Sequence, residues 1–283
     1  MVSVIIPTYN RADTLKESIV SVINQGDYIN EIIIIDDNSS DCTEKIVKSL
    51  NDSRIIYKKL NKSVGACNAR NIGINLSSYD YIAFHDSDDI WCQGKIEKQI
   101  NILKNKKVDI VCSGFNKYYN DNVTYIGRDI ESEDIYKELL KENFIGTPTI
   151  FGKKECFKSN MFDSSMPRFQ DWELMIRLSK KYKVYFLNEP LVNAYVQENS
   201  ISKKVLDGAQ ALKIILKKNM EEISCNKVLL ESYYRRIGVY SLETNDYHKY
   251  FYEAIKANKS IKSIIDYILS LFHFKSLLKR IHN

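Results

Sequence analysis

The sequence predicts an α/β fold in which a mostly parallel sheet is flanked by helices and followed by a C-terminal helical region. The first observation is that short apolar runs alternate with segments of helical periodicity from Val2 to Cys112. The second is that only helical periodicity is found after Ser202. Strand–helix alternation indicates parallel strands with helices on both faces. We therefore expect three parts, namely residues 1–110, 111–202 and 203–283.

The strands expected in the first part are continuous apolar runs, which are typical of strands buried on both faces. In chain order they are Val2–Pro7, Glu31–Asp37, Ile55–Leu60, Tyr81–His85 and Val108–Cys112. Apolar residues three or four positions apart predict a helix after each of the first four strands. These helices lie around Leu15–Ile23, Ile46–Leu50, Gly65–Leu76 and Ile96–Leu103. Asn10 is expected to cap the first helix.

The second part has a looser pattern. Tyr118–Glu133 is polar and predicts irregular structure, whereas Thr149–Gly152 and Val184–Leu187 predict short strands. Asp171 and Trp172 open a predicted helix between those two strands.

Composition excludes several classes of protein. The net charge is +5 with basic residues spread along the chain, so no nucleic-acid partner is expected. No run of 18 or more apolar residues predicts a spanning helix, and Met1 leads straight into a strand rather than a signal peptide. The six cysteines form no C-x-x-C pair and only four histidines exist, which favours reduced thiols in a cytoplasmic protein.

Polar residues follow three of the predicted strands. Their sequences are Pro7-Thr8-Tyr9-Asn10, Asp36-Asp37-Asn38-Ser39 and Asp86-Ser87-Asp88-Asp89. Ligands of such sheets bind at the carboxyl ends of the strands. Clustered carboxylates repel one another unless a cation or a donor-rich ligand lies between them. These three strand ends are therefore the candidate site.

Each residue type at these ends has a functional and a plain structural interpretation. Asp86 and Asp88 suit Mg²⁺ or Mn²⁺ bound together with substrate phosphates, or they form a solvated turn. Asp36 and Asp37 can accept hydrogen bonds from a base and a ribose, or the residues after them, Asn38, Ser39 and Ser40, cap the next helix.

Three other residues carry a similar pair of interpretations. Tyr9 can stack on a base, although tyrosine is common in this chain. Arg70 can pair with a phosphate or with one of the acids. Asp171 is either a general base that accepts the proton of an acceptor hydroxyl or an acid favoured by a helix N-terminus.

Together these segments resemble the family 2 glycosyltransferases, which have a GT-A fold with a Rossmann-like sheet. The matching segments span roughly the first 200 residues and are Val4–Arg11, Ile35–Asp41, Gly65–Gly73, Phe84–Asp89 and Gln170–Leu174. The resemblance implies that residues 1–110 bind a nucleotide sugar and that residues 111–202 bind the acceptor.

The resemblance also implies a role for each site residue. Pro7, Thr8, Tyr9, Asn10, Asp37, Arg70, Asp86 and Ser87 would bind the donor, usually a UDP-sugar. Asp86 and Asp88 would form the Mn²⁺ or Mg²⁺ motif, with Asp88 as the more direct ligand, and Asp171 would be the catalytic base. The implied reaction is a single displacement that inverts the anomeric carbon, in the assembly of a cell-surface polysaccharide or another glycan.

Two positions depart from the family pattern. Gln170 replaces the acid that often precedes the base, and Gln197 occupies the place of a histidine. No Gln-x-x-Arg-Trp motif follows Asp171, which disfavours a processive synthase.

The alternatives are a sugar nucleotidyltransferase, which usually has a glycine-rich loop that Pro7–Arg11 lacks, and a non-catalytic carbohydrate-binding protein.

The C-terminal stretch 260–283 is basic and amphipathic. Its apolar residues recur at helical spacing between cations, and its longest uncharged run, Tyr267–Phe274, is too short to span a bilayer. It predicts either a peripheral contact with the inner face of the cell membrane, where a glycan or lipid-linked sugar would be the acceptor, or a helix packed on the protein or on a second subunit of an oligomer.

Overall fold

The computed structural model describes residues 1–196 and 205–282 and divides into two compact units. The first unit comprises Met1–Ser164 and Gln170–Gln197, and the second comprises Ser165–Phe169 and Glu198–Asn283. Gln197, predicted to replace a histidine, lies outside the described residues. The boundary expected at residue 111 lies inside the first unit and remains a prediction.

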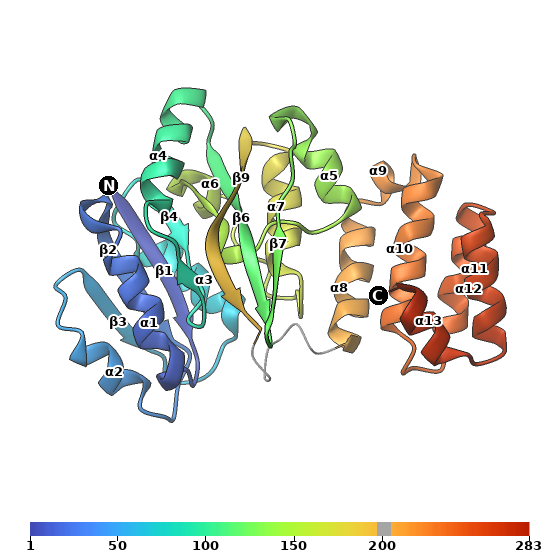
Figure 1. Cartoon of the computed structure of the whole chain (residues 1–283), viewed down its shortest axis with the longest axis horizontal. Helices are drawn as coiled ribbons and strands as arrows, with labels where there is room; N and C mark the ends of the chain where they lie inside the picture. The colour runs from blue at the N-terminus through green and yellow to red at the C-terminus, as the bar shows by residue number, and fades with distance from the viewer. Residues whose placement is uncertain (197–204, 283) are drawn as a thin grey trace. The chain divides into compact units, whose positions relative to one another are not determined.

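One half of the sheet in the first unit is parallel. The strands β3 (Ile55–Lys59), β2 (Ile29–Asp36), β1 (Val2–Thr8) and β4 (Tyr81–Phe84) pair in that order. All seven residues of β1 are buried, as expected for a strand covered on both faces. The helices that follow the strands are α1 (Ala12–Ile23), α2 (Thr43–Ser49), α3 (Ala66–Leu76) and α4 (Lys95–Lys106) (Figure 1). The predicted α/β class and these four strands are confirmed.

The other half of the sheet is mixed. Antiparallel pairing joins β4 to β8 (Phe151–Lys153) and β8 to β6 (Ile110–Tyr119), and β6 then pairs parallel with β9 (Val184–Tyr195). Two short strands, β5 (Ile90–Trp91) and β7 (Asn122–Ile126), pair antiparallel with β9 and β6. The remaining helices of the unit are α5 (Ile135–Lys141), α6 (Lys154–Lys158) and α7 (Gln170–Ser179), with 3₁₀ turns at Gly26–Tyr28, Ser132–Asp134 and Thr147–Thr149.

The expectation of irregular structure over Tyr118–Glu133 is wrong for its first part. β6 and β7 form a hairpin there, with Phe115 opposite Ile126 and Tyr119 opposite Asn122. The strand expected at Val184–Leu187 likewise continues to Tyr195. Its pairing with β6 ends where the rings of Tyr118 and Tyr195 stack at 4.8 Å, so cross-strand contacts outweigh the polar sequence.

Asn10 does not cap α1, contrary to the prediction. Arg11 occupies the N-cap position without a side-chain hydrogen bond. Asn10 adopts a left-handed backbone conformation, φ 49°, and its side-chain oxygen accepts a hydrogen bond from the Ser40 backbone N–H at 2.9 Å. The alternative that Asn38, Ser39 or Ser40 caps α2 is also wrong, because Cys42 is its N-cap. Asn10 therefore joins the loops after β1 and β2.

α3 lies close to β1 because Gly73 has no side chain. A Cβ atom at this position would lie 2.4 Å from Cγ2 of Ile5, closer than two carbon atoms can approach. Ile5 is fully buried in the centre of the sheet. This contact fixes the distance between α3 and the sheet one turn after Arg70.

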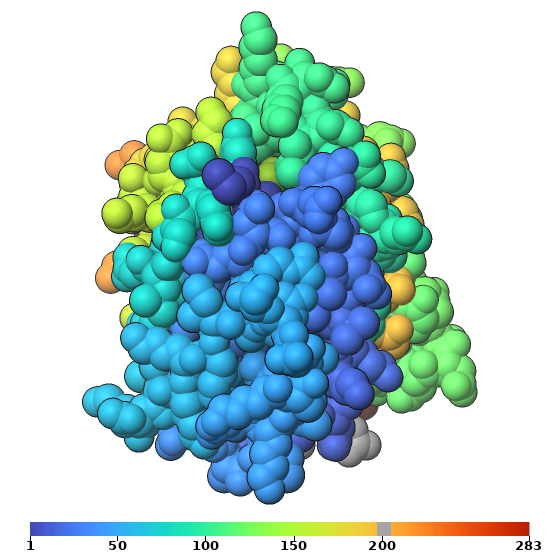
Figure 2. All heavy atoms as spheres, turned by 90° about the vertical axis from the view of Figure 1, so that its left-hand side faces the viewer, coloured from blue at the N-terminus to red at the C-terminus, as the bar shows by residue number. Residues whose placement is uncertain are grey.

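β3 forms one edge of the sheet, because within residues 1–196 and 205–282 β2 is its only strand partner. Figure 2 shows this side of the molecule, where the blue atoms of the N-terminal part of the chain form much of the surface. Ile56 is 45% exposed there, and Lys58 and Lys59 are also exposed.

From Val205 onward the described residues of the second unit form helices joined by short turns, as the sequence predicts. Its helices are α8 (Val205–Lys218), α9 (Met220–Ser224), α10 (Lys227–Tyr240), α11 (Tyr247–Ala257), α12 (Ile261–Leu271) and α13 (Lys275–His282). Tyr247, Phe251, Leu242 and Leu278 form a small core among the last of them. In the two described segments of the chain, no helix has both the length and the apolar character needed to cross a membrane.

Lys95 begins α4 and is completely buried in the first unit. Its ammonium group donates a hydrogen bond to the Gln99 side-chain oxygen at 2.7 Å and lies 4.1 Å from the centre of the Trp91 ring. Burial lowers the pKa of Lys95 to about 7, with Cys112 and Cys92 opposing that shift. Burial and the nearby Lys95 also lower the pKa of His85 to about 3, so this histidine is neutral at pH 7.

Lys95 makes stability depend on pH. Its pKa is about 7 in the folded protein and 10.5 in the unfolded chain. The folded state therefore binds fewer protons between these values, and its stability rises with pH across that window.

We expect Lys95→Met to remove up to about 1.4 kcal/mol per pH unit of this slope. Urea unfolding at pH 7, 8 and 9 measures it. Lys104→Met, an exposed position of α4, is the matched control, and identical slopes for wild type and Lys95→Met would contradict this account.

Candidate functional site

The loops after β1 and β2 are joined by hydrogen bonds that backbone N–H groups donate. The Thr8 carbonyl accepts from the Asp37 N–H at 2.8 Å, and the Ser39 hydroxyl accepts from the Asn10 N–H at 2.9 Å. Pro7 and Thr8 are buried at the end of β1, whereas Tyr9 is 52% exposed. The structure thus brings the predicted residues after these two strands together and leaves the Tyr9 ring accessible.

The two aspartates after β2 have different environments. Asp36 is fully buried, and its carboxylate accepts hydrogen bonds from the Ser39 N–H at 2.7 Å and from the Tyr57 hydroxyl. Burial, followed by this carboxylate, raises the pKa of Tyr57. Asp36 is therefore a structural acid rather than a binding group.

Asp37 holds the loop that precedes α3. Its carboxylate accepts from the Val64 N–H at 2.6 Å, the Gly65 N–H at 2.9 Å and the Ser63 hydroxyl at 2.7 Å. A carboxylate has about four acceptor positions, so one remains for a ligand. Gly65 has φ 85°, a conformation that favours glycine, and it is the N-cap of α3.

The turn after β4 presents two of its three carboxylates to the surface. The side chains of Asp86 and Asp88 are 27% and 20% exposed. Asp89 is buried instead and accepts a hydrogen bond from the Tyr195 N–H at 3.0 Å. Ser87 is buried, and its carbonyl accepts from the Thr14 hydroxyl at 3.0 Å. Only Asp86 and Asp88 of this turn are therefore placed to meet a ligand.

Burial and mutual repulsion affect the charges of this turn. Burial, followed by the charge of Asp86, raises the pKa values of both Asp88 and Asp89 above the ordinary range. Arg11 partly compensates, because its Nε lies 3.4 Å from the Asp88 carboxylate. Further positive charge beside this turn would stabilise the ionised carboxylates.

Arg70 connects the acidic turn to the start of α7. The side chain is 8% exposed and donates to Asp86 at 2.6 Å and to the Gln170 side-chain oxygen at 3.1 Å. Burial disfavours its charge, but the carboxylate of Asp86 outweighs that effect and the pKa of Arg70 is raised. Gln170, the departure from the family pattern, is thus a direct partner of this arginine.

Asp171 follows Gln170 in the first turn of α7. Its carboxylate accepts from the Asn143 amide at 3.1 Å, the Thr147 N–H at 3.2 Å and the Trp172 N–H at 2.7 Å. Burial raises its pKa, and the hydrogen bonds and Arg70 only partly oppose this. A carboxylate with a raised pKa is a stronger base than an ordinary aspartate.

The two carboxylates after β4 are suitable ligands for a divalent cation. Both are hard oxygen donors, and the raised pKa of Asp88 indicates that its negative charge is incompletely compensated. No group of three or more histidine, cysteine, aspartate or glutamate side chains that could hold a metal occurs within residues 1–196 and 205–282. Mg²⁺ commonly keeps several water molecules and binds one or two carboxylates together with substrate phosphates.

Several residues of the site are absent from the sequence-based prediction. Arg11 and Asp89 flank the predicted positions, and the arginine after the β1 loop could have been noticed as a cation near candidate phosphate ligands. Asn143 and Thr147 come from a loop whose sequence gives no sign of its proximity to Asp171. Their contribution depends on the tertiary structure.

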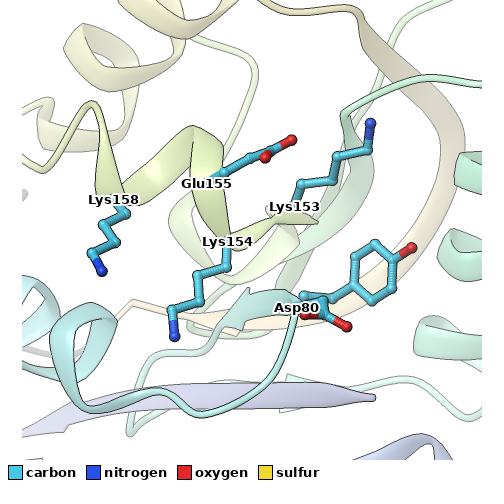
Figure 3. A pocket seen from close by; sticks show the side chains of 6 residues that line it. Asp80, Lys153, Lys154, Glu155 and Lys158 are labelled. Atoms are coloured by element: carbon cyan, nitrogen blue, oxygen red, sulfur yellow. The ribbon is translucent and has the colours of Figure 1, made fainter.

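A cavity of about 410 Å³ lies elsewhere in the first unit, where β4 begins (Figure 3). Asp80 and Tyr81 line it together with Lys153, Lys154, Glu155 and Lys158. Lys153 is paired with Asp109 at 2.7 Å, and Lys154 donates to the Ser77 carbonyl. Because β4 ends at Phe84, this cavity lies at the opposite end of that strand from Asp86 and contains none of the predicted site residues.

Solved structures share this fold. Staphylococcus aureus TarS in complex with UDP-GlcNAc superposes with a TM-score of 0.71 at 16% identity, covering 98% of this chain and 88% of TarS. The mannosyltransferase PcManGT of Pyrobaculum calidifontis, in complex with GDP-Man and Mn²⁺, has a TM-score of 0.60 at 14% identity, covering 99% and 86% of the two chains. The GT-A-like fold expected from the sequence is therefore confirmed.

Sequence relatives identify the family. The Escherichia coli UDP-Glc:alpha-D-GlcNAc-diphosphoundecaprenol beta-1,3-glucosyltransferase WfaP is 34% identical over 233 residues, which cover 80% of this chain and 90% of WfaP. An uncharacterized glycosyltransferase of Rickettsia bellii is 30% identical over 182 residues, and the match spans only 26% of its length. Residues 3–164 match the family model for glycosyl transferase family 2. This chain therefore belongs to glycosyl transferase family 2 and is a glycosyltransferase, rather than a nucleotidyltransferase or a non-catalytic carbohydrate-binding protein.

Proposed function

We propose that this enzyme transfers a sugar from a UDP-sugar to an acceptor hydroxyl by a single, metal-dependent displacement with inversion. The acceptor oxygen forms a bond to the anomeric carbon while the bond from that carbon to the diphosphate breaks. The acceptor proton passes to the carboxylate of Asp171, and the nucleoside diphosphate leaves with the bonding electrons. Donor, acceptor hydroxyl and products balance without another reactant.

The observation that carries this proposal is the position of Arg70 between two candidate groups. It donates to Asp86, in the turn proposed to bind the diphosphate, and to Gln170, which precedes the proposed base. A buried, ionised arginine keeps both partners in place, because loss of Asp86 would leave its charge uncompensated and loss of Gln170 would leave a buried N–H without an acceptor. The leaving-group side and the acceptor side are thereby held near each other.

Asp88 would bind the metal directly, with Asp86 as a second ligand held by Arg70. When bound, a divalent cation neutralises the charge that develops on the leaving diphosphate. The likeness to the mannosyltransferase solved with Mn²⁺ is one of fold, so the metal proposal rests on the carboxylates of this chain. Arg11, beside Asp88, would contact the same phosphates.

The nucleotide would lie over the loops after β1 and β2. Tyr9 is exposed and would stack on the base, and the remaining acceptor position of Asp37 would accept the N–H of uracil. Pro7, Thr8, Asn10 and Ser87 would shape the pocket through the backbone, because the hydrogen bonds of Asn10 hold the two loops together. UDP is favoured because the name of WfaP gives UDP-Glc as its donor.

The acceptor is proposed to be a glycan or a lipid-linked sugar, by analogy with the diphosphoundecaprenol-linked acceptor in the name of WfaP. The reaction would then belong to the assembly of a cell-surface polysaccharide at the cytoplasmic face of the membrane. Peripheral contact through residues 260–283 fits that location. An oligomer is compatible with the same chemistry.

Donor specificity tests the proposed function directly. Incubated with a panel of nucleotide sugars and Mn²⁺, the enzyme is expected to release UDP slowly from at least one UDP-sugar, because water can replace the acceptor. Chromatography of the nucleotide products measures this, and NMR of the glycoside formed with an added acceptor, which unlike the free sugar does not mutarotate, should show an inverted anomeric configuration. Hydrolysis of GDP-sugars alone would identify a GDP-sugar as the donor and refute the assignment of UDP. A retained anomeric configuration would exclude single displacement.

Replacement of the proposed base should affect turnover more than donor binding. Asp171→Asn keeps an oxygen for Asn143 but removes the proton acceptor, so we expect kcat to fall on the order of 100-fold or more. Calorimetric titration with UDP should show unchanged affinity. Asp80→Asn, an exposed acid in the cavity of Figure 3, should leave both values unchanged. Loss of UDP binding in Asp171→Asn would place this residue on the donor side.

The metal assignment predicts a link between Asp88 and divalent cations. Mn²⁺ should tighten the binding of UDP to the wild type, because a cation held by Asp86 and Asp88 would attract the negatively charged diphosphate. Asp88→Asn should abolish that gain and lower turnover strongly, while Asp80→Asn should behave as wild type. Calorimetric titration with UDP, with and without a chelator, measures how much the metal contributes to UDP affinity. Full activity of the chelator-treated enzyme would refute metal dependence.

A further inference from the structure

The helix α12 is amphipathic with its polar side turned inward. Its three buried residues are Ser263, Asp266 and Ser270, each 1% exposed or less. The carboxylate of Asp266 accepts from Nε of Arg235 at 2.7 Å and lies 2.8 Å from Nε2 of His282. Burial opposes ionisation of Asp266, but these two partners lower its pKa below the ordinary value. Ion pairs and hydrogen bonds therefore hold α12 in the second unit.

The apolar side of α12 is exposed as a consequence. It carries five large aliphatic residues, each at least 40% exposed: Ile261, Ile264, Ile265, Ile268 and Leu271. Burial of such side chains away from water stabilises a protein, so an uncovered face of this size is unusual in a monomeric soluble protein. The sequence left open that the helix packs its apolar face on the protein, but within the second unit the polar face does so.

The same surface continues through the turn into α13. Phe272 and Phe274 are 68% and 53% exposed on either side of His273, which adopts φ 57°. In α13, Leu277 and Ile281 are 42% and 49% exposed. We call the exposed apolar residues of α12, the turn and α13 the apolar face.

Cations accompany the apolar face. Residues 259–282 contain Lys259, Lys262, Lys275, Lys279 and Arg280, and Asp266, which is buried, is the one acidic residue among them. Lys259, Lys262, Lys279 and Arg280 are exposed. An apolar helix face with lysine and arginine beside it is complementary to a membrane surface that contains anionic lipids.

We propose that α12, the Phe272–Phe274 turn and α13 dock this protein on an anionic lipid bilayer. At about 1.5 Å per residue, the 11 residues of α12 extend far less than the roughly 30 Å hydrocarbon core, so the helix lies in the interface. The apolar face enters the boundary between head groups and acyl chains, and the cations contact the head groups. This inference does not depend on the identity of the donor or acceptor.

Flotation of the full chain with vesicles tests the proposal. At low salt we expect the chain to bind vesicles of phosphatidylcholine that contain roughly one third phosphatidylglycerol. At about 0.5 M salt we expect its release, because dissolved ions then screen charges over a few ångströms. Vesicles of phosphatidylcholine alone should bind far less. Absence of binding to the anionic vesicles at low salt would overturn the proposal.

Two double variants separate the apolar and the electrostatic contributions. Ile268→Ser with Phe272→Ser should reduce vesicle binding at least tenfold, because both side chains belong to the exposed apolar face. Lys262→Gln with Arg280→Gln should reduce binding about 25-fold, taking roughly fivefold for each cation near an anionic surface. Val228→Ser, which replaces a 65% exposed residue of α10, is the matched control and should bind as wild type. Unchanged binding of both double variants would overturn the proposal.

A second copy of the chain is the competing occupant of the apolar face. Analytical ultracentrifugation without lipid should give a monomer for wild type and for Ile268→Ser with Phe272→Ser, with equal thermal unfolding temperatures as evidence of an intact fold. A wild-type dimer that this double variant dissociates, together with absent vesicle binding, would assign the apolar face to self-association and refute membrane docking.

Discussion

The ion pair between Arg70 and Asp86 organises the candidate site. A buried guanidinium is tolerated only with an ionised partner, because an unpaired charge in such a position costs several kcal/mol. The pair joins α3 to the turn after β4, and the second hydrogen bond of Arg70 reaches Gln170 at the start of α7. Three segments far apart in the sequence are thereby fixed around one side chain. The distance of this side chain from the sheet depends on how closely α3 packs on β1, where Gly73 contacts Ile5.

This arrangement gives a physical meaning to the glutamine at position 170. An acid there would place a second carboxylate on Arg70 and add negative charge beside Asp171, whose pKa burial already raises. The neutral amide accepts the same hydrogen bond without that repulsion. The base can then remain ionised at lower pH than it would beside a further acid.

The parallel half of the fold was predictable because its strands are buried on both faces. Val2–Pro7 and Glu31–Asp37 are continuous apolar runs, and the structure extends or trims them by only a residue or two. The same alternation placed the acids after the strands, so the position of Asp37 and Asp86 at the carboxyl ends of β2 and β4 followed from topology.

Residues that depend on tertiary contacts were not predictable. The β6–β7 hairpin has a polar sequence and is stabilised by pairing that no local pattern reveals. Asn10 has the chemistry of a helix cap, yet its side chain bonds to Ser40 in a neighbouring loop instead. In α12 the periodicity correctly indicated an amphipathic helix, but only the ion pair of Asp266 with Arg235 decides which side faces inward. Periodicity establishes that a helix has two faces and does not establish which one is covered.

The exposed edge at β3 has a further consequence for the behaviour of the protein in concentrated solution. An edge strand offers unpaired backbone groups to any extended chain that approaches it, and such edges are sites of intermolecular strand pairing. Lys58 and Lys59 lie at the end of β3 and are both exposed. Charged side chains on an edge strand, and lysine above all, disfavour such pairing, because they repel cations on another copy and lose contact with water when a second strand covers them. The lysines thereby protect the open sheet against aggregation through this edge.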